Sequence, residues 1–87
     1  MNKMPVDAKD AIADAILQGR FRYAARLLFL WRSRMTIKDE HQIQADIESY
    51  SSYGIKWEWT KYNLAVTIRY RGEVYSYREQ DVTNETW

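Results

Sequence analysis

The sequence contains no cysteine, which excludes disulfide bonds and thiolate metal sites. It has only three glycines and one proline, so it holds no glycine-rich phosphate loop. Its longest apolar run, Leu27–Trp31, is far too short to span a membrane, and its polar start is not a secretory signal. We therefore expect a cytoplasmic protein without a membrane partner and without a cofactor.

The sequence contains a single histidine, which limits the catalytic sites that it can form. His41 is the only one, and it lies in a polar segment where a solvated helix residue is expected. A nucleophile needs a base within hydrogen-bond reach, and no serine–histidine–aspartate or histidine–histidine spacing occurs. Two sets of carboxylates share helical faces, and we interpret both as solvated or salt-bridged rather than as cation sites: Asp7, Asp10 and Asp14, and Asp39, Glu40 and Asp46. The sequence thus predicts no catalytic residues and no metal ligands.

The composition is that of a folded protein. The 87 residues suffice for one domain, 1–87, and the hydrophobic share of 46% argues against disorder. The net charge of +1 does not by itself indicate a polyanionic partner. The charge is unevenly placed, however, because no acidic residue occurs from Ala15 to Lys38.

The first half of the chain predicts three helices, at about 5–18, 20–35 and 37–50. Pro5 suits a first helical turn, and Gly19 suits a helix stop that makes a tight antiparallel hairpin with the next helix. Thr36 and Asp39 have the spacing of a helix N-cap. The third helix carries a single apolar stripe of Ile43, Ile47 and Tyr50.

The helix over 20–35 is expected to be the centre of the fold. At 100° per residue, most of its apolar side chains fall on one half of the cylinder. These are Phe21, Tyr23, Ala24, Leu27, Leu28, Leu30, Trp31 and Met35. The other half carries Arg22, Arg26 and Ser33, with Phe29 beside them. We expect this helix to lie between the first helix and a sheet.

After Gly54 the apolar period changes from 3.6 to 2, which predicts a three-stranded β-meander over 54–79. Arg71-Gly72 makes a two-residue turn that pairs Tyr70 with Glu73 and Val66 with Tyr77. The first loop is expected within 60–63, with two or four residues. Residues 80–87 are expected to be a polar tail. The predicted fold class is α+β: two or three N-terminal helices, then a meander packed on them.

The basic residues of the second helix are the strongest functional signal. Arginine beside tyrosine and phenylalanine is typical of phosphate and base contacts. The candidate binding residues are Arg22, Arg26, Arg32, Arg34 and Lys38. The alternative is that Arg22 and Arg26 pair internally, with Asp7, Asp10 or Asp14, or with Asp39, Glu40 or Glu48. Paired arginines would favour docking on a protein, and free arginines would favour nucleic acid.

Two further surfaces are weaker candidates. The outer side of the sheet carries Lys56, Arg69 and Arg78, beside Glu58. The chain is also rich in aromatics after Ser49, and Tyr53 and Tyr62 are counted as binding candidates. Tyr50 and Trp87 are expected at the edges too, and the alternative for Trp87 is that it folds back onto the domain. Tyrosine, tryptophan and arginine are enriched among the anchors of protein interfaces, although a small aromatic core accounts equally well for the surplus.

The segment TIRYRGEVYSYRE, at 67–79, resembles a little the ribosome-dependent RNA-cleaving toxins, in which an antiparallel sheet bears arginine and tyrosine. The resemblance implies RNA cleavage on the ribosome. It covers that segment only, and the leading strand of those toxins has no counterpart here, so we do not assign membership.

Three hypotheses follow. The first is a non-enzymatic binding protein that docks on another protein or a ribonucleoprotein, as an inhibitor or adaptor. Small proteins of this type are common in phages and mobile elements, where they block host defence. The second is a nucleic-acid-binding protein that uses the basic second helix. The third is an RNA-cleaving toxin-like protein. An open sheet edge would also allow a homodimer.

Overall fold

The computed structural model describes residues 3–50 and 54–84 of the chain. The elements are, in order, α1 (Val6–Leu17), α2 (Phe21–Trp31), α3 (Ile37–Ser49), β1 (Lys56–Trp59), the 3₁₀ turn η1 (Lys61–Asn63), β2 (Ala65–Tyr70), β3 (Glu73–Arg78) and α4 (Glu79–Asn84). The strands form one antiparallel sheet in the order β1-β2-β3. The predicted α+β class, helices first and a packed β-meander second, is confirmed.

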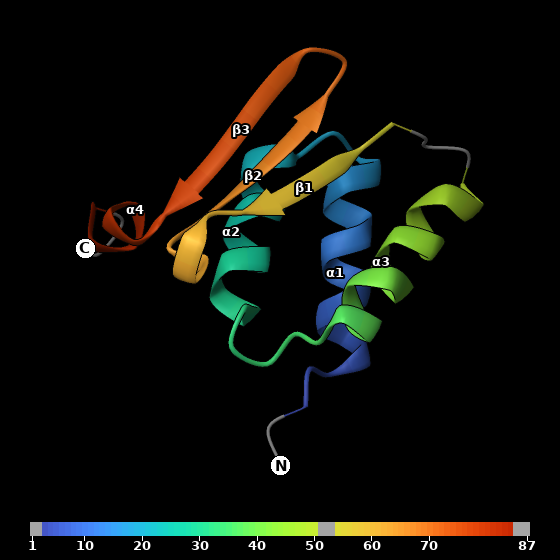
Figure 1. Cartoon of the computed structure of the whole chain (residues 1–87). Helices are drawn as coiled ribbons and strands as arrows, with labels where there is room; N and C mark the ends of the chain where they lie inside the picture. The colour runs from blue at the N-terminus through green and yellow to red at the C-terminus, as the bar shows by residue number, and fades with distance from the viewer. Residues whose placement is uncertain (1–2, 51–53, 85–87) are drawn as a thin grey trace.

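The sheet covers one side of a layer of helices (Figure 1). Helix α2 packs against β2 and β3 and also against α1, so it lies between α1 and the sheet, as expected. Helix α1 packs in turn against α3, which lies beyond the β1 edge of the sheet (Figure 1). The helical layer therefore extends past the sheet on the side of β1.

The turn between α1 and α2 is the predicted tight hairpin. Gly19 has a φ of 76°, a conformation that favours glycine, and it ends α1. Its N–H donates to the carbonyl of Ile16 at 3.0 Å, and the N–H of Arg20 donates to that of Ala15 at 2.8 Å. These bonds satisfy carbonyls at the end of α1, so α2 can begin at once.

The orientation expected for α2 was wrong. Phe29, placed beside the polar stripe, is only 1% exposed, whereas Leu30 is 44% exposed and Tyr23 is 39% exposed. The reason is the sheet: Phe29 packs on Tyr77 of β3, with ring centroids 5.5 Å apart, and Ala25 beside it is fully buried. The buried side of α2 is therefore rotated from the predicted one. The helix also ends at Trp31 rather than at 35, because the chain turns over Arg32–Arg34 to reach α3.

Helix α3 begins with the predicted cap. The Thr36 hydroxyl accepts from the N–H of Asp39 at 3.1 Å, and the Asp39 carboxylate accepts from the N–H of Thr36 at 3.0 Å. Ile43 and Ile47 are fully buried, as expected. Tyr50, placed on the same stripe, lies past the last helical residue, so the buried stripe ends at Ile47. Its exposure of 73% confirms the separate expectation that it lies at an edge.

The second hairpin matches the prediction residue by residue. Tyr70 pairs with Glu73, Ile68 with Tyr75 and Val66 with Tyr77, and the intervening pairs follow. Arg71 and Gly72 both have positive φ, 50° and 82°, as a two-residue type I′ turn requires. In the first hairpin, Trp57 pairs with Ile68 and Trp59 with Val66, so both indoles lie on the helix-facing side.

The first loop is longer than either predicted length. It runs from Thr60 to Leu64 and contains η1, and Leu64, expected in a strand, is 53% exposed. The Thr60 hydroxyl accepts from the N–H of Ala65 at 2.9 Å, which closes the loop one residue later than expected. Tyr62 and Asn63 have positive φ within it.

The C-terminal tail also needs correction. Residues 79–84, most of which were predicted only as a polar tail, form the short helix α4. The Asp81 carboxylate accepts from the N–H of Arg78 at 2.8 Å and so caps its first turn. Two predicted surface residues, Tyr53 and Trp87, lie outside the described residues.

Candidate interaction surfaces

One side of α2 faces away from both the sheet and α1. We call it the outer α2 face, and it consists of Arg20, Arg22, Tyr23, Leu27, Leu30 and Arg34. Leu27 is half-buried against the core, while Tyr23 and Leu30 are more exposed. Tyr23, Leu27 and Leu30 follow one another at four- and three-residue steps, so their side chains lie along one line of the helix. Arg20 precedes this line and Arg34 follows it, whereas Arg22 lies at its border, on the side of Phe29. The result is an apolar strip with arginines at both ends.

Three arginines in or near this face, Arg20, Arg32 and Arg34, stack on neighbouring aromatic rings rather than pairing with carboxylates. The guanidinium carbon of Arg20 lies 4.5 Å from the centre of the Tyr23 ring, and that of Arg34 lies 5.5 Å from Trp31. Arg32 lies 3.8 Å from the Phe29 ring and donates to the Phe29 carbonyl at 2.8 Å. Such stacking holds the planar groups in place without neutralising them.

Internal ion pairs were expected for Arg22 and Arg26, and the structure separates the two. Arg22 is exposed and makes no hydrogen bond or ion pair with the described residues. Arg32 and Arg34 have no carboxylate partner within the same part of the chain. Arg26 is half-buried and does take part in an interaction, so it is not counted as free. The described carboxylates thus leave the charge of Arg22, Arg32 and Arg34 in place.

The predicted basic cluster divides between the two ends of α2. Arg22 lies at its start, whereas Arg34 and Lys38 lie at the far end, where the chain enters α3. There they line a cavity of about 400 Å³ together with two lysines that precede or begin α1, Lys3 and Lys9. Thr36, Asp39, Gln42 and Met4 complete the lining. Sequence reasoning missed the two lysines because only the α1–α3 contact brings them there.

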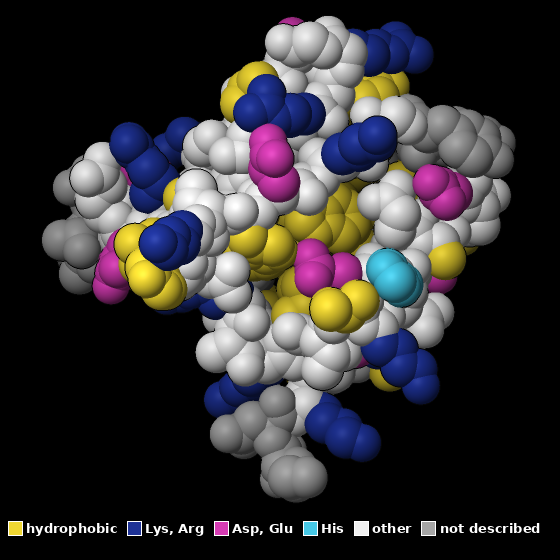
Figure 2. Space-filling view, in the orientation of Figure 1, with side chains coloured by type: hydrophobic (Ala, Val, Ile, Leu, Met, Phe, Trp, Pro, Cys, Tyr) yellow, Lys and Arg dark blue, Asp and Glu magenta, His cyan; other side chains and the backbone are white. Residues whose placement is uncertain are grey.

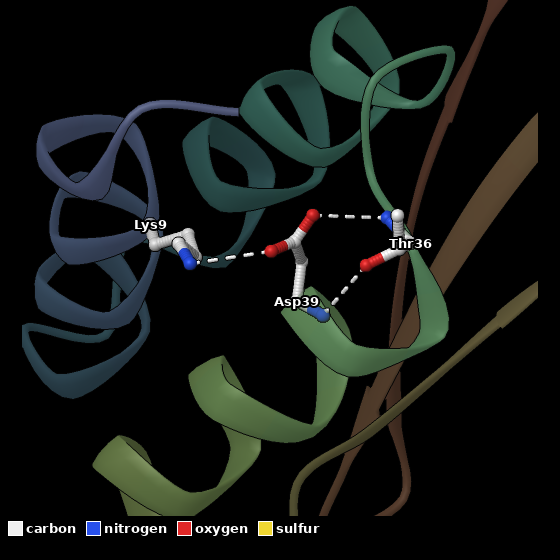
Figure 3. Close-up of polar contacts among 3 residues, drawn as sticks. All are labelled: Lys9, Thr36 and Asp39. Atoms are coloured by element: carbon white, nitrogen blue, oxygen red, sulfur yellow. Dashed lines mark hydrogen bonds and ion pairs between the residues drawn. The ribbon is translucent and has the colours of Figure 1, made fainter. Parts of the chain in front are cut away.

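Asp39 holds this end of the molecule together (Figure 3). Besides capping α3 with Thr36, its carboxylate accepts from the Lys9 ammonium at 3.2 Å, which ties α1 to α3. The hydrogen bond from the Thr36 N–H, helped by Lys9, holds the pKa of Asp39 below its ordinary value. We interpret Asp39 and Lys9 as structural, since each already has its partner.

The outer side of the sheet does not present a continuous basic surface. Arg69 lies opposite Lys56 in the ladder and donates to the Glu58 carboxylate at 2.7 Å. Arg78 lies at the other end of β3, beside α4. Figure 2 shows basic side chains scattered over this side with acidic ones among them. The three predicted residues are therefore not brought together as one site.

The space between β1 and α3 holds a site that the sequence did not predict. Trp57 and Trp59 both donate their indole N–H to the same carboxylate oxygen of Glu40, at 2.8 and 2.9 Å. A hollow of about 300 Å³ lies beside them, lined by Ile37, Glu40, His41, Gln44, Lys56 and Trp57. Figure 2 shows hydrophobic surface in a hollow between the sheet and α3, with acidic side chains at its border.

A signal for this site was present in the sequence. The alternation of β1 puts both indoles on one side, and Glu40 continues the line of Ile43 and Ile47 on α3. What the sequence lacked was the packing of α3 beside β1. His41, expected to be solvated, is exposed and lines the hollow.

Of the aromatic candidates, Tyr62 is well exposed, at 78%. It lies at the tip of the first hairpin, and the Lys61 ammonium is 5.1 Å from its ring centre. It belongs neither to the outer α2 face nor to the hollow beside β1. Tyr62 is therefore an isolated exposed ring.

In residues 3–50 and 54–84, no group of three or more histidine, aspartate or glutamate side chains is placed to hold a metal ion. None of the helices in this part of the chain has the length and apolar character needed to cross a membrane. Comparison with protein-family models, with curated proteins and with solved structures finds no match for this chain.

Proposed function

We propose that this protein is a non-enzymatic binding protein that docks on a macromolecular partner through the outer α2 face. The observation that carries the proposal is the exposure of Tyr23 and Leu30 on the helix that also forms the centre of the core. A helix that needed only one packed face would carry polar residues at these positions. Such a surface would serve a protein that inhibits its partner, or an adaptor that links the partner to another molecule.

The chemistry of the face indicates an acidic protein surface as its partner. Tyrosine and arginine are typical anchors of protein interfaces. Arg20 and Arg34 are already stacked on Tyr23 and Trp31, so binding costs them less side-chain entropy than it would cost free arginines. Carboxylates of the partner would pair with these groups while apolar side chains cover Leu30.

The test is affinity capture from a lysate of the source cells, with and without nuclease. The double variant Arg22→Glu/Leu30→Ser changes the outer α2 face, and Lys61→Glu, at the tip of the first hairpin, is the matched control. We expect a complex that survives nuclease, is lost with the double variant and is retained with the control. A monomeric protein that captures nothing would remove the basis of the proposal.

Nucleic-acid binding is the second candidate, and a specific observation favours it. Arg22 has no carboxylate partner among the described residues, and Lys3, Arg34 and Lys38 line one cavity. Binding of this type loses affinity steeply as salt rises, because counterions are released from the phosphates. We expect Arg22→Glu/Arg26→Glu to weaken it strongly if it occurs. Salt-independent binding, or no binding at low salt, would reject it.

A further inference from the structure

Strand β1 has an open edge. It pairs with β2 on one side, and no other strand of the described chain pairs with it. The N–H of Thr60 donates to the carbonyl of Ala65, which marks Thr60 as a residue bonded toward β2. Because bonded residues alternate along an antiparallel strand, Glu58 and Lys56 also bond toward β2. The N–H and C=O groups of Trp57 and Trp59 therefore point to the open edge.

The space next to that edge is bounded on one side by helix α3, and no strand of the described chain occupies it. Helix α3 lies on the helix-facing side of the sheet and beyond β1, where a fourth strand would lie above it (Figure 1). Trp57 and Trp59 reach across to Glu40, and Ile37 is left 71% exposed at the border of the hollow. An added strand would cover both the indoles and Ile37.

We infer that this groove binds an extended segment of a partner protein, which adds to β1 as a fourth strand. Backbone bonds to Trp57 and Trp59 would supply affinity, as in other complexes where a peptide extends a sheet edge. Four residues of β1 set the length of the pairing. The inference concerns a different surface from the outer α2 face and does not depend on it.

Glu40 specifies the charge of the segment. One of its carboxylate oxygens, Oε1, accepts from both indoles, and the other makes no hydrogen bond or ion pair with any described residue. A lysine or arginine of the segment would complement this carboxylate. Alternate side chains of the added strand face α3, so we expect one basic residue with an apolar residue two positions away.

A second copy of this chain does not fit the groove. An antiparallel pair of β1 strands keeps both sheets facing the same way. The second copy would then bring its own helices to the side where α3 already lies (Figure 1). A single extended segment has no such layer, so it is the occupant that the groove admits.

The experiment begins with selection of random linear peptides, displayed on phage, on the full chain. The enriched peptides are synthesised, and each of their backbone amides is methylated in turn. We expect binding to fall about tenfold or more at alternate amides and to change little at the others, because only alternate amides bond to β1. Absence of enrichment, or losses without alternation, would overturn the inference.

Amide hydrogen exchange supplies an independent readout. In the free protein, we expect the amides of Lys56 and Glu58 to be protected and those of Trp57 and Trp59 to exchange rapidly. Peptide binding should protect the latter two. If Trp57 and Trp59 are protected beforehand and sedimentation shows a dimer, a second copy fills the edge and the inference is wrong.

The charge of the segment is tested with Glu40→Gln, which keeps an acceptor oxygen for the indoles but removes the charge. We expect about tenfold weaker binding of a lysine-bearing peptide and unchanged binding of the same peptide with norleucine instead. Glu79→Gln, on α4, is the matched control and should change neither. Equal losses of affinity for both peptides would reject the role of Glu40. Arg22→Glu should leave peptide binding intact, which separates this site from the outer α2 face.

Discussion

The two long sides of α2 carry similar side chains but have different surroundings. On the inner side, Ala25 and Phe29 are buried against β3, and Arg32 covers the Phe29 ring. On the outer side, Tyr23 and Leu30 have arginines beside them but no element of the described chain over them. Apolar character alone therefore does not determine which side forms the core. The inner side stabilises the fold, and the outer side is available to a partner.

The largest expected effect comes from the inner side. Phe29→Ala should lower the free energy of unfolding by about 3–5 kcal/mol, because it opens a cavity against Tyr77. Urea denaturation measures this directly. Leu30→Ala, one residue further, is the matched control and should cost well under half as much, since that side chain is 44% exposed. Equal losses in the free energy of unfolding would mean that the inner and outer sides of α2 contribute equally to stability.

A loss of this size could unfold a small protein outright. Phe29→Leu keeps most of the volume and should cost about 1 kcal/mol, which leaves a folded protein to measure. The ranking of the two positions then remains testable even if the alanine variant does not fold.

The comparison also explains how far the sequence could predict the fold. The sheet was predictable because its period is two, so a shift of one residue would expose Val66 and Ile68 and bury Arg69. No comparable constraint fixes the rotation of α2, where apolar side chains occupy more than half of the circumference. The choice between Phe29 and Leu30 depends on where β3 lies, which the helix sequence does not contain.

The candidate sites show the same limit. The basic residues of α2 were recognisable from their spacing, but their division between two ends of the helix follows from where α2 stops. The pairing of Glu40 with Trp57 and Trp59 spans 17 and 19 residues. It depends on α3 packing beside β1, which neither local pattern specifies. Residues that converge through tertiary packing are the ones that sequence patterns miss.

A smaller effect is expected where Lys9 and Asp39 join α1 to α3. The pKa of Asp39 is below its ordinary value of 3.8 in the folded protein, so its contribution to stability is present above about pH 4 and is lost as pH falls through the folded pKa. Asp39→Asn should remove about 1 kcal/mol at neutral pH, through the weakened cap and lost ion pair. It should also flatten the dependence of stability on pH below pH 4.

Urea denaturation at several pH values measures this dependence. Lys9→Met is the second variant, because the Lys9 ammonium contributes to lowering the pKa of Asp39. We expect it to reduce the pH dependence less than Asp39→Asn does, since the hydrogen bond from Thr36 remains. An identical pH dependence in the unchanged protein and in Asp39→Asn would contradict the assigned role.

The expected effect on stability is also small at the outer α2 face, and there it coincides with the largest effect on docking. Leu30→Ser with Arg22→Glu removes exposed apolar surface and reverses a charge that has no partner among the described residues, so little folded-state interaction is lost. Because Leu30 is 44% exposed, we expect this variant to lower the free energy of unfolding by about 1 kcal/mol, well below the loss for Phe29→Ala. Urea denaturation and partner capture, performed on the same preparation, separate the two properties. A variant that loses capture while remaining fully folded shows that the outer side of α2 serves binding, whereas a variant that loses stability in proportion shows that this side belongs to the core.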